Sequence, residues 1–493
     1  MELIAGLDFG TSSVKLAVVT PDGEVLARAH ADYPTRAGHS GEMEQDPGDW
    51  WEAARRALAE TGLGQRLGAL GLTGQMQDLI PVAAGRALRP ALLYSDTRAT
   101  AEHERLLREL PDWERLTGNQ QDASNVAAKI AWLAGHEPET LAAAEHLLLG
   151  APGFVAWRAT GAAVVDTITA STTGLLGVAE RAWLAPVARA AGCDAALLPR
   201  LLGPLPEDAV VGAVTAAAAA ELGVPAGIPV VHAMGDAGST TDGLVGSEPG
   251  DAYLYLGTTG WFAAVTEVDP AAEPSPIHSL VMPGWDARLR IGAVQSAGAS
   301  ANWARKCFLP GLDFATIETR IAARIAEPGS AAAQPLCLPG LGGERTPVRD
   351  ADFRGAFIGV QEATGPDDFY LSVLMGVAMA LRHAADSLGV HQRRIPLVGG
   401  AASSAAWRRI LADVFDATIV TREANDPGTH SAARAAAAAL AIPHRLEPLF
   451  TPGPTDIETR PSRDRGLLEP LIAAHRRLYD ALAPSFHDIA NAL

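Results

Sequence analysis

The sequence predicts an α/β protein built from two similar lobes. Its 493 residues correspond to roughly two to four domains of about 100–200 residues each. The chain opens with a meander of three short strands and continues with strands and helices in alternation, which is typical of a mixed α/β fold. A strand, a Gly-Thr turn and a second strand then recur halfway along the chain.

The opening meander is predicted from its turns. Strands are expected over 2–8, 14–19 and 24–31, because the turn sequences Gly10–Ser13 and Thr20–Gly23 separate short apolar runs there. A dinucleotide-binding Rossmann domain would instead pass from its first strand into a helix and carry G-x-G-x-x-G at that point. Neither feature is present in the sequence, so this class of domain is excluded.

A helix and a further strand are expected after the meander. Asp46 and Pro47 are residue types preferred at the N-cap and the first position of a helix. Its apolar face is predicted from residues at helical spacing: Trp50, Ala53, Ala54, Ala57 and Leu58. Residues 69–72 are expected to form a strand that ends in the polar loop 73–78.

The half-length repeat sets the predicted domain boundary. The segment Leu7–Ser13 is echoed by Tyr255–Gly260, and each leads into a second predicted strand. We therefore expect an N-terminal lobe of residues 1–245 and a C-terminal lobe of residues 246–493, with Gly243–Gly250 as a hinge. One short repeat is weak evidence alone, but its position at the start of both halves strengthens it.

The second half carries a candidate phosphate or ribose site. A short strand over 396–398 leads through Gly399–Ala401 into a helix over 405–415. Glycines between a strand and a helix present backbone N–H groups to an anion at the helix N-terminus. A binding role for this turn is therefore expected.

The remainder of the second half is predicted from its composition. A long apolar helix is expected over 369–385. Residues 443–467 are rich in proline and are expected to form a surface excursion. A last helix is expected over 468–482.

Composition and charge exclude several classes of function. The formal net charge of −18 argues against a nucleic-acid surface, which needs clustered Lys and Arg. The three cysteines lie far apart without C-x-x-C spacing, so no zinc site or disulfide framework is evident. None of the lysines, Lys15, Lys129 and Lys306, follows a Gly in G-K-[ST], so there is no Walker A loop.

The location of the protein is predicted from two absences in the sequence. The N-terminus lacks the basic region of a signal peptide and soon reaches Asp8. No uninterrupted apolar run reaches the ~18 residues that a membrane span needs. We therefore expect a cytoplasmic protein without a membrane partner.

Asp8 is the first candidate for chemistry, because it closes a strand directly before Gly10, Thr11 and Ser12. A carboxylate there can hold Mg²⁺ while the N–H and hydroxyl groups of the turn face phosphate oxygens, and Lys15 could add positive charge. An Asp that only fixes a hairpin turn through side-chain hydrogen bonds fits the same residues. The motif alone does not separate the two interpretations.

Asp236 is the second candidate. It follows an apolar strand in Gly-Asp-x-Gly, before a helix expected from Ser239. An acid at the carboxyl end of a strand opens onto the crevice of an α/β sheet and suits a general base for an attacking hydroxyl. The alternative is a helix N-cap, which Asp favours. His232, inside the strand, is expected to be a satisfied core histidine.

Two loops are further candidates. Gly257–Gly260 could hold the β- and γ-phosphates of a nucleotide with backbone N–H groups, although an ordinary hairpin turn fits the same sequence. Gln75–Asp78 form a polar loop at a strand end, where a plain surface loop is the alternative. Neither loop decides between these interpretations by itself.

Together the motifs resemble the FGGY family of carbohydrate kinases. Their order and spacing are specific and extend along nearly the whole chain. The matching segments are GLDFGTSSVKLAVV (6–19), EQDPGDWW (44–51), TGQMQ (73–77), YSDTRA (94–99), KIAWL (129–133), GDAG (235–238), LGTTG (256–260), LPGLGGERTP (338–347), RGAFIGV (354–360) and GGAASSAAWRRILAD (399–413).

The resemblance implies an α/β fold of two RNase-H-like lobes, as in the actin/hexokinase/Hsp70 ATPases, with sugar and ATP in a central cleft. It implies ATP and Mg²⁺ as cofactors, Asp236 as catalytic base and Asp8 as the acid linked to Mg²⁺. It also implies roles for matching positions in four binding segments: Thr11, Ser12 and Lys15 in a first phosphate loop, Gly257, Thr258 and Thr259 in a second, Gly400 and Ala401 at adenosine, and Gln75, Met76, Gln77 and Asp236 at the sugar.

Within the family, the chain most resembles the members that phosphorylate xylulose, and it departs from them at two positions. Those members usually have Gln-Met-His-Gly where this chain has Gln75–Asp78, and Asn where it has Ala237. Both positions are expected to face the sugar, where hydrogen bonds discriminate strongly. We expect conversion of D-xylulose to D-xylulose 5-phosphate, with another ketose or polyol (L-xylulose, ribulose or xylitol) as the alternative.

Two other classes of function are considered, an actin- or chaperone-like ATPase and a sugar-binding pseudokinase. The loop Gln75–Gln77 and the segment GERTP favour a sugar kinase over the first. Retention of Asp8 and Asp236 favours catalysis over the second. The expected partners are the sugar and ATP, and the chain could form a homodimer.

Overall fold

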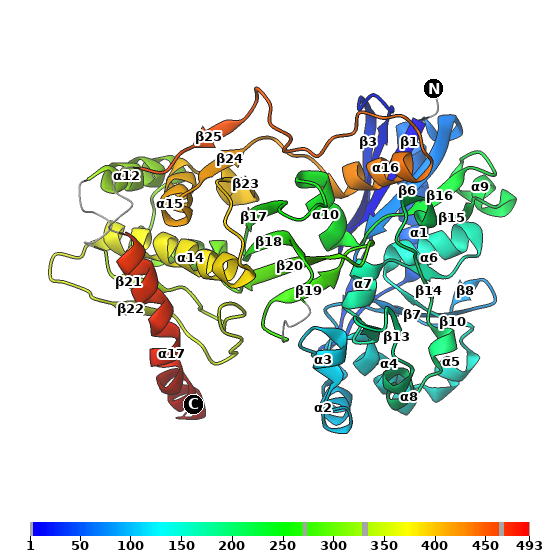
Figure 1. The fold of residues 1–493 in the computed structure, drawn as a ribbon, viewed down its shortest axis with the longest axis horizontal. Helices are drawn as coiled ribbons and strands as arrows, with labels where there is room; N and C mark the ends of the chain where they lie inside the picture. Colours follow the sequence, from blue (N-terminus) through cyan, green and yellow to red (C-terminus); the bar gives the residue numbers. More distant parts are fainter. Residues whose placement is uncertain (1–2, 270–273, 328–333, 463–467, 493) are drawn as a thin grey trace.

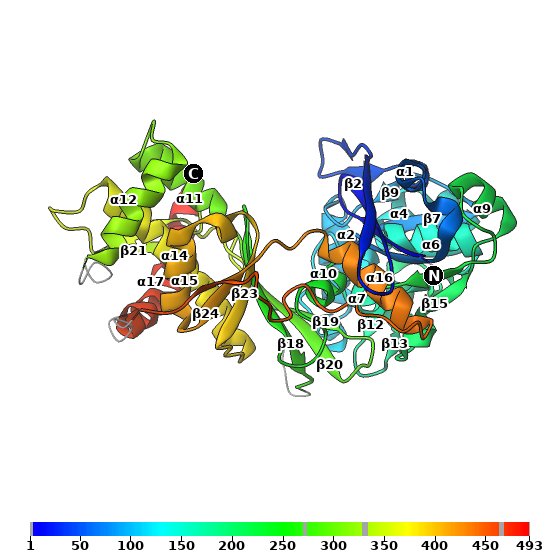
Figure 2. The same cartoon turned by 90° about the horizontal axis from the view of Figure 1, so that it is seen from above.

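The computed structural model describes residues 3–269, 274–327, 334–462 and 468–492. Two α/β lobes lie side by side and several chain segments cross between them (Figures 1 and 2). The N-terminus belongs to one lobe and the C-terminus to the other (Figure 1). No helix in these ranges is long and apolar enough to cross a bilayer.

The first lobe is built on a six-stranded sheet of order β15-β16-β6-β1-β2-β3. Its strands are β1 (Leu3–Phe9), β2 (Ser13–Val19), β3 (Val25–Asp32), β6 (Leu67–Gly74), β15 (Val210–Ala213) and β16 (Pro229–His232). The first three strands pair antiparallel, which confirms the predicted meander. β6 pairs parallel to β1, and β16 pairs parallel to β6.

The second lobe repeats this topology in a seven-stranded sheet of order β19-β20-β18-β17-β23-β24-β25. Its strands are β17 (Ala252–Leu256), β18 (Gly260–Glu267), β19 (His278–Val281), β20 (Ala287–Val294), β23 (Arg394–Val398), β24 (Thr418–Thr421) and β25 (Ile457–Thr459). β17, β18 and β20 form an antiparallel meander, and β23 and β24 continue it in parallel. Both lobes therefore have the RNase-H-like order that the family resemblance implies, and they are similar to each other, as the half-length repeat predicted.

Helices cover both faces of the first sheet. Along β1, Leu3, Ala5 and Leu7 share a core with α1 (Pro47–Thr61) and α6 (Ala151–Thr160). Ile4, on the opposite face, packs instead with α16 (Pro427–Ala439). The start of α1 is as predicted, since the Asp46 side chain accepts a hydrogen bond from the Gly48 N–H and Pro47 is the first residue.

α16 crosses from the second half of the chain onto the first sheet, beside α10 (Asp236–Leu244) (Figure 2). Its backbone touches the strands directly. A Cβ atom at Gly6 would lie 2.0 Å from the Thr429 carbonyl oxygen, and one at Gly71 would lie 2.1 Å from the Ala432 carbonyl oxygen. The division of the chain at 245–246 stays a prediction. α16 follows this position in the sequence but packs on the sheet of the first lobe.

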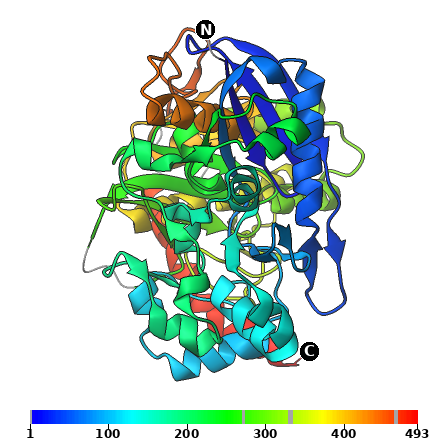
Figure 3. The same ribbon diagram turned by 90° about the vertical axis from the view of Figure 1, so that its right-hand side faces the viewer.

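The first lobe also contains a smaller mixed region, at the lower right of Figure 1 and at the bottom of Figure 3. A second sheet of order β10-β7-β9-β5-β4 packs there with several helices; β4 is Arg36–Ala37, and β8 (Arg86–Ala87) pairs with β7. Its main elements are β5 (Met43–Gln45), β7 (Leu79–Ala83), β9 (Ala91–Leu92), β10 (His146–Leu149), α2 (Thr100–Glu109), α3 (Trp113–Thr117), α4 (Val126–His136), α5 (Pro138–Ala143), α7 (Thr167–Ser171) and α8 (Ala185–Ala191). α9 (Ala216–Leu222) packs instead with α1 and α6 on the first sheet.

The second lobe has five long helices on its sheet and edges. They are α11 (Gly298–Phe308), α12 (Phe314–Ala326), α14 (Pro366–Leu388), α15 (Ala405–Phe415) and α17 (Leu468–Ala492). α15 has the predicted bounds, α14 is longer at both ends than predicted, and α17 continues ten residues beyond the predicted end at Leu482.

One prediction about a loop was incomplete, and another was wrong. The proline-rich stretch 443–467 contains strand β25, which pairs antiparallel with β24 at the sheet edge. A strand of Ile457–Thr459 is too short for its alternation to be recognised among prolines; residues 463–467 lie outside the described ranges. Thr73 and Gly74 belong to strand β6 and not to the polar loop, because β1 pairs with β6 as far as Phe9 and Gly74.

A buried histidine pair joins α14 to α17. His383 Nε2 lies 3.1 Å from His475 Nδ1, and His475 Nε2 donates to the Cys337 carbonyl oxygen at 2.9 Å. Burial, assisted for His383 by His475, Arg476 and Arg382, lowers the pKa from 6.5 to about 3 for His383 and to about 4 for His475. Both rings are therefore neutral in the folded protein near pH 7.

We expect the free energy of unfolding to fall between pH 7 and pH 5. The histidines take up protons in the unfolded chain over this window and not in the folded chain, so stability declines as pH falls. For His383 the loss is about 2 kcal/mol. Urea unfolding at both pH values measures it. His383→Gln should reduce the pH dependence and exposed His39→Gln should not; equal pH dependence in all three proteins would contradict this assignment.

Candidate active site

Two carboxylates meet where β1 ends and α10 begins. Asp8 lies at the carboxyl end of β1, and Asp236 is the first residue of α10. Burial, followed by the charge of Asp236, raises the pKa of Asp8 to about 7, and Lys15 acts in the opposite direction. The structure therefore brings together the two acids that the sequence singled out.

One oxygen of Asp8 is available to a cation. Asp8 Oδ1 is buried and has no hydrogen-bond partner among the described residues. Oδ2 faces the start of α16, where a Cβ at Gly428 would come within 2.3 Å of it. A hard carboxylate oxygen suits Mg²⁺, which often uses one or two carboxylates together with waters and substrate phosphates. In the described ranges, no three or more His, Cys, Asp or Glu side chains form a metal cluster.

Asp236 is exposed, and its position argues against a purely structural role. Gly235 is the N-cap of α10, and the helix has no side-chain cap bond, so the N-cap interpretation of Asp236 was wrong. The Thr240 hydroxyl donates to Asp236 Oδ1 at 3.2 Å. Protein atoms crowd the carboxylate, and this desolvation raises the pKa of Asp236 above its ordinary value. A raised pKa suits a carboxylate that must accept a proton.

The loop that leads to Asp236 is held by a residue that the sequence analysis missed. Asp166 Oδ1 accepts from the Gly235 N–H and from the Thr169 N–H, each at 3.0 Å. The hydroxyls of Thr73 and Ser239 both donate to the Met234 carbonyl oxygen at 2.7 Å. The Asp-Thr pair at the start of α7 is a detectable helix start, but no local signal connects Asp166 to Gly235.

His232 fits its predicted role in part. It is 1% exposed, and its Nδ1 lies 2.8 Å from the Ala233 carbonyl oxygen. Its Nε2 has no partner within the described ranges. It is a core histidine with only one ring nitrogen satisfied.

The first Gly-Thr turn is tied to the predicted sugar loop by a buried amide. Gln45 Nε2 donates to the Thr11 carbonyl oxygen at 2.6 Å. Gln45 Oε1 accepts from Trp50 Nε1 at 2.8 Å and from Gln75 Nε2 at 3.0 Å. Thr11 and Ser12 are exposed at the turn. In the sequence, Gln45 was recognised only as part of the family motif EQDPGDWW. Its connecting role became visible only from contacts between distant residues.

Lys15 lies on β2 directly opposite Asp8 in the strand register. Its Nζ forms a 3.1 Å ion pair with Asp426 Oδ1, just before α16. It also lowers the pKa of both Asp8 and Asp236. Lys15 is therefore near the carboxylates, while its role toward phosphate stays a prediction.

The predicted sugar loop presents its residues differently. Gln75 is 4% exposed and supports the Gln45 network. Met76 packs over Gly235, since a Cβ there would lie 2.4 Å from the Met76 sulfur. Gln77 adopts a left-handed φ of 65°, and its Nε2 donates to the Ser124 carbonyl oxygen at 2.9 Å and hydroxyl at 3.0 Å. Met76 therefore lies nearest to the start of α10.

Lys129 holds the backbone of this loop through hydrogen bonds to carbonyl oxygens. It is fully buried, and its Nζ donates to the carbonyl oxygens of Gln77 at 2.9 Å and Leu93 at 2.6 Å. Asp78, also buried, accepts from the Tyr94 N–H at 2.9 Å. Burial lowers the pKa of Lys129 and raises that of Asp78, while their mutual attraction favours both charges.

The second Gly-Thr turn lies on the N-terminus of α11. The Thr258 carbonyl oxygen accepts from the N–H groups of Ala297 at 3.1 Å and Ala299 at 3.0 Å. The Gly257 carbonyl oxygen accepts from the Gly298 N–H at 2.9 Å. Thr258 is exposed, and Thr259 is half-buried. These bonds hold the turn in place and leave the Thr258 side chain toward solvent.

The predicted adenosine segment lies beside that turn. Gly399, with φ of 95°, passes close to the end of β17, because a Cβ there would be 2.5 Å from the Leu256 carbonyl oxygen. Gly400 and Ala401 begin a 3₁₀ turn, Gly400–Ser403, and Ser404 caps α15. The prediction that the glycines lead directly into α15 was therefore wrong, because this short 3₁₀ turn lies between them. A Cβ at Gly400 would meet open space.

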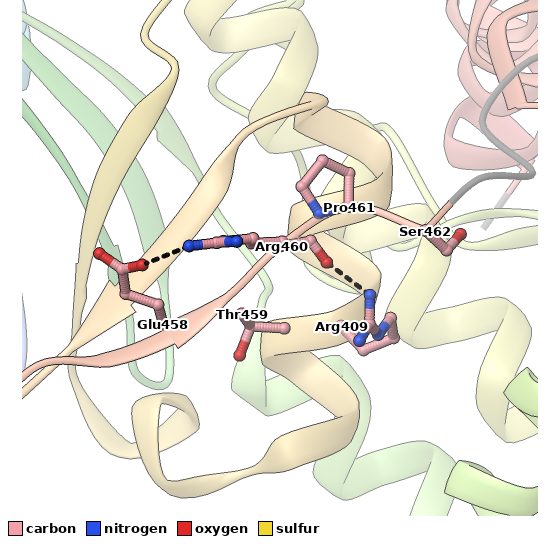
Figure 4. A pocket seen from close by; sticks show the side chains of 6 residues that line it. All are labelled: Arg409, Glu458, Thr459, Arg460, Pro461 and Ser462. Atoms are coloured by element: carbon pink, nitrogen blue, oxygen red, sulfur yellow. Dashed lines mark hydrogen bonds and ion pairs between the residues drawn. The ribbon is translucent and has the colours of Figure 1, made fainter.

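A surface hollow of about 640 Å³ lies away from these residues, beside β25 (Figure 4). Its Arg409 donates to the Arg460 carbonyl oxygen, and the Arg460 side chain forms a 3.6 Å ion pair with Glu458 (Figure 4). These cationic groups already have partners, and the hollow contains none of the candidate site residues.

Comparison with known proteins identifies the family. The model of the FGGY carbohydrate kinases, N-terminal domain, matches residues 3–243, and that of the C-terminal domain matches residues 252–440. The chain is 32% identical over 491 residues to the xylulose kinase of Escherichia coli, covering 97% of this chain and 99% of that protein. The chain belongs to the FGGY family of carbohydrate kinases and is a sugar kinase.

Solved structures confirm the fold. The xylulose kinase of Rhodospirillum rubrum superposes with a TM-score of 0.85 at 27% identity, covering 99% of this chain and 100% of that one. The gluconate kinase of Lactobacillus acidophilus has a TM-score of 0.87 at 23% identity, covering 99% of each chain. The predicted actin/hexokinase-like architecture is therefore confirmed, and the fold alone does not select the sugar.

The contact of Asp166 with Gly235 predicts a mutational effect. Asp166→Ala removes the acceptor that fixes the loop before Asp236, and we expect kcat to fall by about tenfold, since a misplaced group is costly. Asp166→Asn keeps the Oδ1 acceptor and should stay within about threefold of wild type. Steady-state kinetics on the two variants decide this; equal losses in both would mean that the Asp166 charge matters and not the hydrogen bond.

Proposed function

We propose that this sugar kinase transfers the γ-phosphate of ATP to D-xylulose and forms D-xylulose 5-phosphate. The observation that carries the catalytic part is the meeting of Asp8 and Asp236 at the ends of β1 and α10. The choice of sugar is supported by the 32% identity to a xylulose kinase over nearly the full length of both chains. L-xylulose, ribulose and xylitol are the alternatives.

Asp236 acts as the general base in this proposal. It takes the proton from the primary hydroxyl of the sugar, whose oxygen then bonds to the γ-phosphorus as the bond to the ADP oxygen breaks. The proton remains on Asp236 until solvent removes it. The Asp236 carboxylate is accessible to a substrate, and the desolvation that raises its pKa suits it to accept a proton.

The phosphates are held by the two Gly-Thr turns. Thr11 and Ser12 on one side, and Thr258 and Thr259 on the other, offer hydroxyl and N–H groups to phosphate oxygens. Asp8 would hold Mg²⁺ through Oδ1, which has no hydrogen-bond partner among the described residues. When bound, Mg²⁺ supplies positive charge that neutralises the phosphates. Gly400 and Ala401 would contact adenosine, where Gly400 leaves open space.

Met76 and Gln77 contact the sugar in this proposal, and Gln75 supports them through Gln45. Both donor hydrogen bonds of Gln77 already go to Ser124, so its Oε1 is the group left for a sugar hydroxyl. Ala237, after Asp236, offers no hydrogen bond. The pocket is therefore less polar there than one with Asn.

The first test concerns the base. Asp236→Asn removes the proton acceptor, and kcat should fall by about 10²–10⁴-fold while sugar binding is retained. Turnover of D-xylulose and calorimetric sugar titration measure the two quantities. Asp480→Asn, on the exposed side of α17, is the matched control. Near-normal turnover in a folded Asp236→Asn protein would exclude the base role.

The second test concerns Asp8. Asp8→Ala removes the oxygen proposed to bind the metal. The Mg²⁺ concentration that gives half-maximal activity should therefore rise by about tenfold or more, while the Kd for sugar changes little. Initial rates across Mg²⁺ concentrations, with sugar titration in parallel, measure this. An unchanged Mg²⁺ dependence would contradict the assignment of Asp8.

The third test concerns specificity. Gln77→His combined with Ala237→Asn introduces the two side chains usual in xylulose-phosphorylating relatives. Recovery of one hydrogen bond should raise kcat/KM for D-xylulose relative to other sugars by about 2–13-fold. The measurement compares D-xylulose, L-xylulose, D-ribulose and xylitol before and after the change. Strong wild-type preference for D-xylulose without improvement in the double variant would refute the specificity role of both positions.

A further inference from the structure

The side chain of Gln77 is held by residues 119–125, the coupling loop, which joins α3 to α4. Gln77 Nε2 donates to the carbonyl oxygen of Ser124 at 2.9 Å and to its hydroxyl at 3.0 Å. Lys129, on α4, donates to the carbonyl oxygen of Gln77 at 2.9 Å. The orientation of Gln77 in the predicted sugar loop is therefore set by the coupling loop and α4.

Asp122 fixes Ser124 within the coupling loop. Asp122 Oδ1 accepts from the Ser124 N–H at 2.9 Å and from the Ser124 hydroxyl at 2.5 Å. Asn125 Oδ1 accepts from the Asp122 N–H at 2.6 Å, and Asn125 Nδ2 donates to the Thr172 carbonyl oxygen at 2.7 Å. A displacement of the Asp122 carboxylate would therefore move the hydroxyl to which Gln77 donates.

Two segments from the second half of the chain contact the coupling loop. Asn119 Nδ2 donates to the Ser279 carbonyl oxygen and Asn119 Oδ1 accepts from the Ser279 N–H, both at 2.8 Å. This buried amide thus pairs with β19, the edge strand of the second sheet. Farther along the loop, Arg349 Nη2 lies 3.4 Å from Asp122 Oδ2, and Arg349 Nη1 donates to Gln120 Oε1 at 3.3 Å. The loop that holds Gln77 is therefore a point of contact between the lobes.

Arg349 is held by contacts within the second lobe. Glu344 and Asp350, on either side of it in the chain, exchange backbone hydrogen bonds at 2.8 and 3.0 Å. A few residues later, the buried ring of Phe353 stacks on Tyr479 of α17, with ring centroids 5.0 Å apart. The position of Arg349 therefore depends on the second lobe, whereas its partner in the coupling loop belongs to the first.

The ion pair between Arg349 and Asp122 is informative through its placement and not through its strength. The two side chains are 44% and 45% exposed, and exposed ion pairs contribute little to folding stability. The two oxygens of the Asp122 carboxylate, however, contact different lobes. Oδ1 holds Ser124, and Oδ2 faces Arg349. This carboxylate therefore joins the support of Gln77 to the second lobe.

We propose that the coupling loop transmits the relative position of the lobes to Gln77, with Arg349 and Asp122 as positioning residues for the sugar. This role rests on the proposed contact of Gln77 with a sugar hydroxyl. When the lobes approach each other, Arg349 restrains Asp122, and the coupling loop holds Gln77 Oε1 in one orientation. When the lobes separate, this restraint is lost. Because coupling of this kind is reciprocal, a sugar bound at Gln77 also favours the arrangement in which Arg349 contacts Asp122.

The coupling is tested first without any sugar. Arg349→Met removes the positive charge of the ion pair, and hydrogen exchange of the full-length protein should become about 2–5-fold faster in residues 119–125 and 75–78. Arg320→Met is the matched control, because Arg320 forms an ion pair of similar exposure with Asp367 inside the second lobe. Unchanged exchange in Arg349→Met, or equal changes in Arg320→Met, would overturn the coupling.

The positioning role is tested by steady-state kinetics. In Arg349→Met the KM for D-xylulose should rise by about 2–5-fold, while the KM for ATP and the behaviour of Arg320→Met stay as in wild type. The difference between Arg349→Met and wild type should shrink in about 0.5 M NaCl, because salt screens an exposed ion pair. A rise in the KM for ATP instead would assign Arg349 to the nucleotide phosphates and overturn its role toward the sugar.

A double variant separates positioning from a general structural effect. Gln77→Gly removes the side chain and suits the left-handed φ of 65°. Adding Arg349→Met to Gln77→Gly should raise the KM for D-xylulose no further, because no side chain remains to be oriented. An equal rise in both backgrounds would overturn the role of Arg349 toward Gln77. If D-xylulose is not phosphorylated at all, the proposed function fails, while the exchange measurement still decides whether the coupling loop responds to Arg349.

Discussion

The site depends on direct backbone contact between α16 and the elements around it. Gly6 on β1, Gly71 on β6 and Gly243 on α10 each leave room for a carbonyl oxygen of α16 or its first residue, where a Cβ would lie about 2 Å from that oxygen. Any larger residue would push the helix off the sheet, because protein interiors do not absorb such an overlap. The approach of Gly428 to Asp8 belongs to the same contact. The geometry around the two carboxylates therefore depends on glycines, whose lack of a side chain lets α16 approach this closely.

Local patterns in the sequence predicted local structure well. The meander, the capped start of α1 and the bounds of α15 follow from turn residues, an N-cap and helical spacing over short stretches. The repeated Gly-Thr turn also predicted two similar lobes, and both are built on a sheet that begins with an antiparallel meander. Each of these features is determined by residues that are close in the chain, so a single sequence contains the needed information.

What the sequence could not predict depends on residues far apart. Asp166 reaches Gly235 and Gln45 joins Thr11 to Gln75 only after the chain has folded. Strand β25 exists because the edge of β24 offers it a partner, although the stretch around it is rich in proline. The candidate carboxylates were found because strand ends are marked by Gly-rich turns, whereas their supporting residues carry no comparable local mark.

The residues of the shared framework and the side chains proposed to contact the sugar determine different properties. The carboxylates and Gly-Thr turns lie on the framework that a gluconate kinase shares at a TM-score of 0.87. In the proposed function, the sugar is chosen by side chains on that framework, such as Gln77 and Ala237. Family membership is shown by the sequence match along nearly the whole chain, and we propose that the substrate depends on a few groups beside Asp236.

The return of α16 to the first lobe has a consequence for synthesis on the ribosome. The sheet of that lobe is translated early, since β16 ends at His232, but the helix that covers one of its faces ends at Ala439 of 493 residues. Until that helix leaves the exit tunnel, Ile4, Val231 and their neighbours have no covering helix on that face. An exposed apolar sheet face invites aggregation and binding by chaperones during translation. One face of the first sheet therefore stays without its covering helix while most of the second lobe is translated.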